Sequence, residues 1–213
     1  MSENDPILKL QKLLSHKIGL MDQLFSKMME SDSALRIPEI TKHIFESGGK
    51  KIRPLLCIAT AEALNYKLDK HILLAATIEF IHTATLLHDD VVDGSKKRRG
   101  KKTANFIWGN KSSILVGDFL LSKAFKILIN DGSLKCIDIV SNVSEKISFG
   151  EVKQLMSIGK LNVSESDYLE IIGFKTAELF SAACQLSSEI SEIDFTKKKS
   201  LKDFGYFLGI AYQ

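Results

Sequence analysis

Hydrophobic residues recur every three to four positions along most of this chain, a spacing typical of amphipathic helices. Residues 71–88 are instead apolar on nearly every side and contain neither Gly nor Pro, so they are predicted to form a buried helix. No segment requires a strand, and we expect an all-α, single-domain bundle of about ten helices spanning residues 1–213. Helical patterns cover residues 6–30, 38–46, 71–88, 103–131, 134–158, 164–190 and 201–213.

Three carboxylates, Asp89, Asp90 and Asp93, follow the apolar segment 71–88. At about 100° per residue, Asp89 and Asp93 fall within about 20° of His82, so these side chains form one polar stripe. Carboxylates this close raise one another's pKa unless a cation lies between them. Oxygen ligands favour Mg²⁺, which keeps water and substrate phosphate as further ligands. The stripe predicts a site for Mg²⁺ and diphosphate; the alternative is an acidic helix end on the surface.

Basic residues are concentrated on both sides of segment 71–88. Upstream, two glycines precede Lys50 and Arg53, and a Lys with an Arg fork at a helix start makes a good anion site. Downstream, residues 94–102 form a polar loop that would neutralise the excess charge of diphosphate beside a metal. A solvated loop is the alternative for both segments, and a nuclear-import or nucleic-acid patch is another for residues 94–102.

Two later helical segments also contain polar residues at notable positions. Glu151 and Gln154 share one face of segment 134–158, where they could form a structural hydrogen-bonded pair or line a cavity. Lys175 lies in an otherwise apolar stretch, so it needs an anionic partner or must extend to solvent.

The overall composition is that of an ordinary soluble protein, with 45% hydrophobic and 26% charged residues among 213. The net charge of +3 is too small to indicate a nucleic-acid partner. Cys57, Cys136 and Cys184 are widely spaced among apolar neighbours, which favours reduced thiols over disulfides or zinc. The acidic N-terminus does not resemble a signal peptide. We therefore expect a cytoplasmic protein without a transmembrane span.

Four motifs in this order resemble those of the trans-prenyltransferases. They are GGKKIRP at 48–54, HTATLLHDDVVD at 82–93, RRG at 98–100 and FKTAELF at 174–180. The likeness runs from about residue 5 to the end of the sequence, and it is greatest to long-chain polyprenyl diphosphate synthases of the octaprenyl and solanesyl type, which make quinone side chains such as that of ubiquinone. The resemblance implies an isoprenoid synthase fold, a helical bundle around a central cavity.

The resemblance also implies a reaction, in which isopentenyl diphosphate is joined to an allylic diphosphate such as farnesyl diphosphate with loss of pyrophosphate. Mg²⁺ would be the cofactor, held by Asp89 and Asp93, with Asp90 in the same motif. Arg98 and Lys175 would complete the catalytic set. The residues expected to hold isopentenyl diphosphate are Lys50, Arg53, His82 and Arg99. Those expected to face the allylic diphosphate are Arg98, Lys175, Thr176 and Gln213.

Product length in this family is limited by side chains beneath the first aspartate motif. Ala84 and Thr85 are small here, which implies an open shaft for a long product. Family membership further implies a homodimer and a peripheral membrane contact for product release.

The sequence departs from the family pattern in one respect. Family members continue past the segment resembling YFLGIAYQ into a second aspartate-rich motif, whereas this sequence stops at Gln213 and contains no second D-D-x-x-D. We therefore expect an isoprenoid synthase bundle that is incomplete at the C-terminus. The intact first motif favours a synthase, and the absent second motif favours a non-catalytic partner subunit or an inactive fragment. A terpene cyclase is less consistent with GGKKIRP, because a cyclase does not bind isopentenyl diphosphate.

Overall fold

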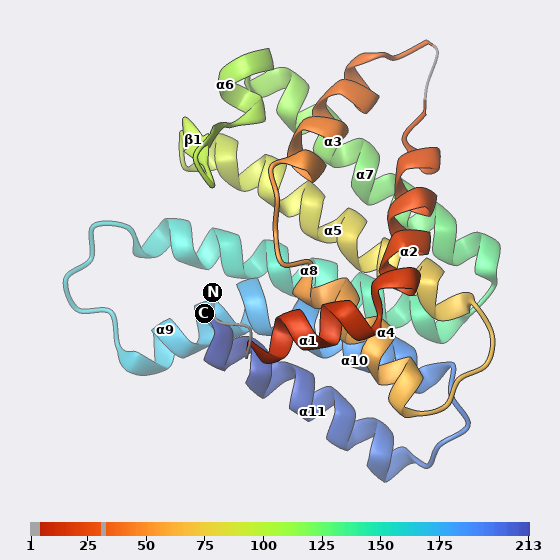
Figure 1. Ribbon diagram of the computed structural model, residues 1–213. Coiled ribbons are helices and arrows are strands. Elements are labelled where there is room, and N and C mark those ends of the chain that lie inside the picture. The colour runs from red at the N-terminus through yellow and green to blue at the C-terminus, as the bar shows by residue number, and fades with distance from the viewer. Residues whose placement is uncertain (1–4, 31–32) are drawn as a thin grey trace.

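The computed structural model describes residues 5–30 and 33–213, which fold into a bundle of helices (Figure 1). The all-α prediction is confirmed. The helices in chain order are α1 (Pro6–Leu13), α2 (Ser15–Met28), α3 (Arg36–Glu46), α4 (Ile52–Ala63), α5 (Lys70–Val92), α6 (Ala104–Trp108), α7 (Asn110–Asp131), α8 (Leu134–Ser157), α9 (Glu165–Ile172), the π-helical turn η1 (Gly173–Ala177), α10 (Glu178–Glu189) and α11 (Phe195–Tyr212).

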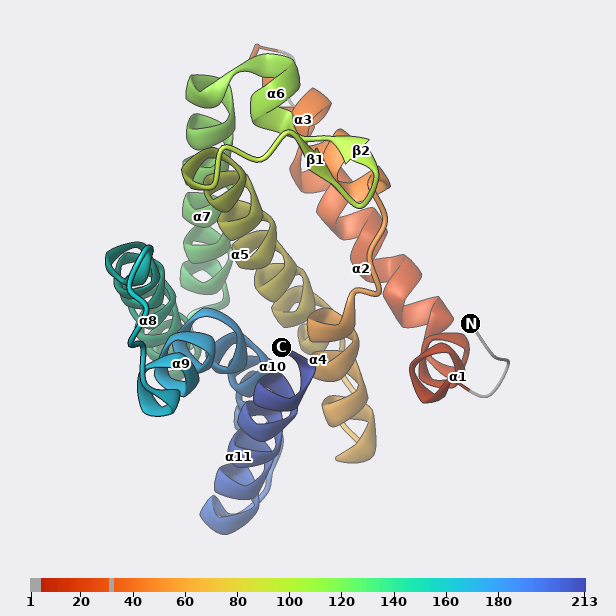
Figure 2. The ribbon, with the colours of Figure 1, turned by 90° about the vertical axis from the view of Figure 1, so that its left-hand side faces the viewer.

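Helix α5 lies at the centre of the bundle and packs against α2, α4, α7 and α10 (Figures 1 and 2). Its side chains are buried on all sides, as the apolar pattern predicts, and Phe80 stacks on Phe25 of α2 with ring centroids 4.4 Å apart. The helix continues beyond residue 88 to Val92, so Asp89 and Asp90 lie in its last turn and Asp93 is its C-cap. Its length and hydropathy would suffice to cross a membrane, but 72% of its most apolar window is buried inside the protein.

The expectation that no strand forms is wrong between α5 and α6. Strands β1 (Lys97–Arg98) and β2 (Lys101–Lys102) pair antiparallel, with Arg98 opposite Lys101. The two-residue turn between them has positive φ at Arg99 (50°) and at Gly100 (80°), which is the backbone of a type I′ hairpin turn. Gly100 allows this turn because it has no Cβ.

Two predicted helices are divided in the structure. Segment 6–30 bends at Leu14, whose side chain is buried in the core, so α1 and α2 each keep an apolar face on the bundle. Segment 164–190 is interrupted by η1, in which one turn adopts π-helical geometry.

The final helix begins earlier than residue 201, where the apolar pattern resumes. The side chain of Asp194 accepts a hydrogen bond from the backbone N–H of Lys197 at 2.9 Å and caps the first turn of α11. Helix α11 then packs closely along α10, because Gly205 and Gly209 are buried at the contact.

Candidate functional site

The three carboxylates at the end of α5 have different environments. The side chain of Asp90 is 4% exposed, and its Oδ1 accepts hydrogen bonds from Nε (3.0 Å) and Nη2 (2.9 Å) of Arg98 on β1. The backbone carbonyl of Asp90 accepts a further bond from the side-chain amide of Asn105 in α6. Asp90 therefore fixes the hairpin and α6 to the end of α5.

Asp89 lies instead on the side of α5 that faces η1. Its Oδ2 is 3.9 Å from Nζ of Lys175, and its side chain is 14% exposed. Burial, followed by the negative charge of Glu151, raises the pKa of Asp89 to about 6, against the opposing effect of Lys175. A nearby cation stabilises a carboxylate in this setting, because positive charge favours its ionised form.

Lys175 has the anionic partner that its apolar surroundings require. Its ammonium group donates hydrogen bonds of 2.9 Å each to Glu151 Oε2 and to Gln154 Oε1 of α8. Glu151 and Gln154 thus share a partner, and the π-helical turn η1 presents Lys175 between them and Asp89.

Asp93 is exposed and follows Asp89 by one helical turn, as the predicted stripe requires. In the part of the chain that the structure describes, no group of three or more His, Cys, Asp or Glu side chains is arranged to hold a metal. The donor set formed by Asp89 and Asp93 fits Mg²⁺, since this ion is usually bound by one or two carboxylates together with water and phosphate oxygens.

The four residues expected to hold isopentenyl diphosphate line one cavity of about 50 Å³. It lies between the loop that precedes α4, the middle of α5 and the hairpin turn. Its polar and charged lining residues are Lys50, Lys51, Arg53, Glu79, His82, Thr83, Arg99 and Tyr212. The cavity therefore combines cations from residues 50–53 and from Arg99 with the imidazole of His82, from three segments that are far apart in the sequence.

Arg53 and His82 form the buried part of this cavity. Arg53 Nη1 lies 3.2 Å from His82 Nε2, and its guanidinium lies 4.7 Å from the centroid of the Phe180 ring. Burial lowers the pKa of Arg53 to about 10, so it stays charged at neutral pH. Burial and the nearby Arg53 and Arg99 lower the pKa of His82 well below 6.5. His82 is therefore neutral, and its Nε2 accepts the hydrogen bond from Arg53.

Sequence reasoning missed Glu79 as a residue of this cavity. Glu79 is 8% exposed, and burial raises its pKa, whereas Lys51 and Arg53 lower it. Glu79 Oε2 and Arg53 Nε are both buried without a hydrogen-bond partner in the structure. Glu79 was detectable, because it is the one acidic residue in segment 71–88 and lies three positions before His82 on the same helical face.

A second small cavity lies beside the first and shares Ile44, Leu86 and Arg99 with it. Asp90 and Arg98 belong to the lining of this second cavity. Arg99 therefore connects the cationic cavity to the region of the aspartates.

The remaining predicted residues lie at two other places. Thr176 in η1 donates a 2.7 Å hydrogen bond to Oε1 of Gln213, which attaches Gln213 to the turn that carries Lys175. Ala84 is 2% exposed within the core, and Thr85 donates a 2.8 Å hydrogen bond to the backbone carbonyl of His82. The open shaft beside Ala84 and Thr85 stays a prediction.

Comparison with known proteins places this arrangement in a family. The model of the polyprenyl synthetase family matches residues 35–213. The chain is 42% identical over 205 residues to the octaprenyl diphosphate synthase of Escherichia coli (strain K12), which covers 96% of this chain and 63% of that protein. The octaprenyl diphosphate synthase of Haemophilus influenzae is 39% identical, with 96% and 62% covered.

Two solved structures share the fold closely. The decaprenyl diphosphate synthase from Rhodobacter capsulatus superposes with a TM-score of 0.95 at 45% identity, covering 98% of this chain and 64% of that one. A polyprenyl synthase from Caulobacter crescentus CB15, complexed with calcium and isoprenyl diphosphate, gives 0.94 at 43% identity, covering 100% and 65%. The chain thus spans a little less than two thirds of these relatives. It belongs to the polyprenyl synthetase family.

Proposed function

We propose that this chain carries out the Mg²⁺-dependent, head-to-tail condensation of isopentenyl diphosphate with an allylic diphosphate such as farnesyl diphosphate. The product is a long-chain, all-trans polyprenyl diphosphate. The observation that supports this most is that one buried helix, α5, carries both His82 in the cationic cavity and Asp89 beside Lys175. Two anionic groups can therefore bind along the same helix.

The cationic cavity suits the diphosphate of the isopentenyl substrate. Lys50 and Arg99 are exposed and free to adjust to a phosphate, while Arg53 is held in place by His82 and Phe180. A fixed guanidinium binds phosphate oxygens in a planar, two-point manner and loses little side-chain freedom.

The allylic diphosphate would lie at the end of α5, between Asp89, Asp93 and the residues of η1. Lys175 and Thr176 would donate hydrogen bonds to it, with Gln213 beside Thr176. Arg98 lies near the same region but is hydrogen-bonded to Asp90. We therefore assign it to offsetting the negative charge of the diphosphate from a short distance. Breaking the allylic C–O bond leaves negative charge on the departing diphosphate, which these cations would stabilise. The double bond of isopentenyl diphosphate would then attack the allylic cation to form the new C–C bond, and the departed pyrophosphate would take the proton that is lost. No protein nucleophile is needed.

Asp89 and Asp93 are the residues that would hold Mg²⁺. When bound, the ion would add positive charge at the departing diphosphate. The Caulobacter crescentus structure, which contains calcium and isoprenyl diphosphate, supports a divalent ion and a substrate of this class.

Other parts of the proposal rest on what membership of this family implies. We propose a homodimer, a product that serves as a quinone side chain such as that of ubiquinone, and peripheral membrane contact during product release. Cys57, Cys136 and Cys184 are buried and unpaired, which fits a reducing compartment such as the cytoplasm.

The test is incorporation of labelled isopentenyl diphosphate into butanol-extractable product by the purified chain with farnesyl diphosphate and Mg²⁺. Asp89→Ala should abolish the product, whereas Asp203→Ala, which removes an exposed carboxylate from α11, should not. Product that is insensitive to Asp89→Ala would contradict the assigned site.

A non-catalytic partner subunit or inactive fragment is the second candidate, because the chain spans a little less than two thirds of the synthases that it matches. Folded protein that binds isopentenyl diphosphate but makes no product would favour it.

A further inference from the structure

The loop that joins α3 to α4 has an unusual backbone at Lys51. This residue is the N-cap of α4 and has φ 45° and ψ 42°, in the left-handed region. That conformation is disfavoured for residues with a Cβ and persists only where the surroundings hold it. Because Lys50 precedes Lys51 directly and Arg53 follows it by two residues, the same backbone sets the direction of two cations in the cavity.

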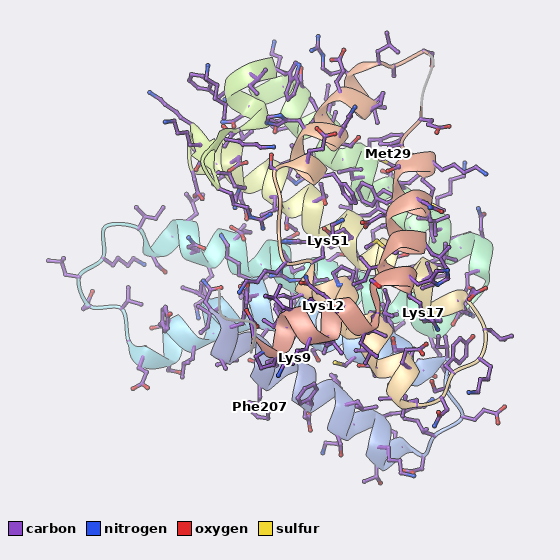
Figure 3. All side chains as sticks on the ribbon, in the orientation of Figure 1. Lys9, Lys12, Lys17, Met29, Lys51 and Phe207 are labelled. Atoms are coloured by element: carbon purple, nitrogen blue, oxygen red, sulfur yellow. The ribbon has the colours of Figure 1, made fainter. Side chains whose placement is uncertain are left out.

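The side chain of Lys51 is held by α2 and α3. Its Nζ donates to both carboxylate oxygens of Asp22 in α2 at 2.8 Å and lies 3.7 Å from the centroid of the Phe45 ring. The two charged side chains are 21% and 31% exposed, so solvent screens this pair only in part. Figure 3 shows Lys51 on the segment between α3 and α4, alongside α2.

Helix α1 contributes a second attachment to the same loop. The side-chain amide of Gln11 donates a 2.6 Å hydrogen bond to the backbone carbonyl of Lys50. The family model matches the chain from residue 35, so Gln11 and Asp22 both lie before the matched region.

We propose that α1 and α2 hold this loop in its diphosphate-binding shape, with Asp22 as a positioning residue that acts through Lys51. The inference rests on the proposed binding of isopentenyl diphosphate in the cationic cavity. Asp22 does not touch the substrate. It keeps the Lys51 ammonium directed toward α2, so that Lys50 and Arg53 remain available to the diphosphate.

A positioning role and simple electrostatics predict opposite effects of Asp22→Asn on diphosphate binding. Removing a carboxylate near a cationic site favours an anion, so electrostatics alone would tighten diphosphate binding. Loss of the anchor instead lets the loop leave its strained conformation and misplaces Lys50 and Arg53, which weakens binding.

A second ion pair between α2 and α4 supplies a matched control. Lys17 of α2 pairs with Glu62 near the end of α4, with side chains 29% and 35% exposed, against 21% and 31% for Lys51 and Asp22. Glu62 also lies 3.6 Å from the buried His71 of α5. Glu62→Gln breaks this attachment at the other end of α4 from the loop. It should cost similar stability and leave the cavity unchanged.

The experiment combines hydrogen exchange with calorimetric titration of isopentenyl diphosphate into the purified chain and the two variants. In Asp22→Asn, we expect faster exchange at the amide of Leu55, which donates to the backbone carbonyl of Lys51 at 3.0 Å. We also expect an affinity for isopentenyl diphosphate that is about tenfold weaker, with unchanged affinity for farnesyl diphosphate. Glu62→Gln should show neither effect, and its melting temperature should fall by as much as that of Asp22→Asn.

Unchanged exchange at the amide of Leu55 in Asp22→Asn would overturn the anchoring role. Faster exchange with unchanged or tighter binding of isopentenyl diphosphate would overturn the positioning role alone, as would equal weakening in Glu62→Gln. If the wild-type chain binds no isopentenyl diphosphate, the proposed function itself fails, and the positioning role fails with it.

Discussion

Ionisable side chains are buried next to one another along α5, and each affects the protonation state of its neighbour. The charge of Arg53 and the burial of His82 both favour the neutral imidazole, which can then accept a hydrogen bond from the guanidinium. Glu79 lines the same cavity, and its negative charge opposes the loss of a proton from Arg53. The cavity is therefore cationic at neutral pH, although burial disfavours the charges of Arg53 and Glu79.

The depressed pKa of His82 predicts how stability depends on pH. Below about pH 6.5, the unfolded chain protonates this imidazole and the folded protein does not. His82 therefore lowers the free energy of unfolding as the pH falls, by at most about 1.4 kcal/mol per pH unit. The free energy of unfolding should fall less steeply between pH 6.5 and 5 in His82→Gln than in the wild type, as measured by urea denaturation. Parallel curves for the two proteins would contradict a depressed pKa.

Ala84 gives a second residue-scale prediction. If the growing chain extends along α5 beneath Asp89, a Phe ring at position 84 should block it and shorten the product. Reverse-phase chromatography of the dephosphorylated products would measure this, with Ala84→Ser as a control that keeps the side chain small. Because overpacking costs about 1–3 kcal/mol, folding of Ala84→Phe should be checked first. An unchanged product distribution would contradict the shaft.

Sequence alone identified the residues of the cationic cavity better than it identified their partners. Lys50, Arg53, His82 and Arg99 were expected together and do line one cavity. The bonds of Lys175 to Glu151 and Gln154 could not be assigned, because they depend on how η1 is placed against α8. Residues distant in the sequence meet only through packing, which no local pattern encodes.

At the scale of elements, close approach between helices depends on glycine. A Cβ built on Gly205 of α11 would lie 2.6 Å from the backbone carbonyl oxygen of Phe180 and 2.9 Å from the Cα of Ser181 in α10. At Gly209, it would lie 2.5 Å from the Cα of Ala177. These contacts are with backbone atoms, which cannot move aside as a flexible side chain would. Since Ala177 is the last residue of η1, the two glycines set the distance of α11 from both α10 and η1.

We expect Gly205→Ala to lower the free energy of unfolding by about 1–3 kcal/mol, because α11 must shift away from α10. Gly19→Ala in α2 is the matched control. A Cβ there has nothing within 4 Å, so alanine should raise the free energy of unfolding by about 0.5–1 kcal/mol through its better helix propensity. Urea denaturation of both variants would test this, and equal effects would contradict the role of close packing.

Helix patterns predicted the elements well, but not where they are interrupted. The capping role of Asp194 was missed because the apolar pattern resumes only at Leu201. The hairpin of residues 97–102 was missed because a run of lysines and arginines lacks the alternation of a strand. The π-helical turn η1 carries no sequence signal of its own, yet it orients Lys175.

On the scale of the whole molecule, α8 and α9 extend away from the body of the bundle and are joined at their far end by an irregular segment (Figure 1). The outer part of α8 exposes four large apolar side chains at helical spacing. They are Phe149 (55% exposed), Val152 (56%), Leu155 (56%) and Met156 (66%). Exposed apolar groups gathered on one helix favour association, whereas scattered ones do not.

We therefore expect the chain to self-associate through α8 in a concentration-dependent manner. Replacing both Val152 and Leu155 with Glu should shift it toward monomer, because two charges would have to be buried at the contact. The free energy of unfolding should change little, since both side chains are already exposed. Leu68→Glu is the control, because Leu68 is an exposed apolar residue (68%) between α4 and α5, at the opposite end of the bundle from the outer part of α8 (Figure 1). Light scattering coupled to size-exclusion chromatography would measure the molar mass. A monomeric wild type across micromolar concentrations would contradict an associating surface, and dissociation by Leu68→Glu would assign it elsewhere.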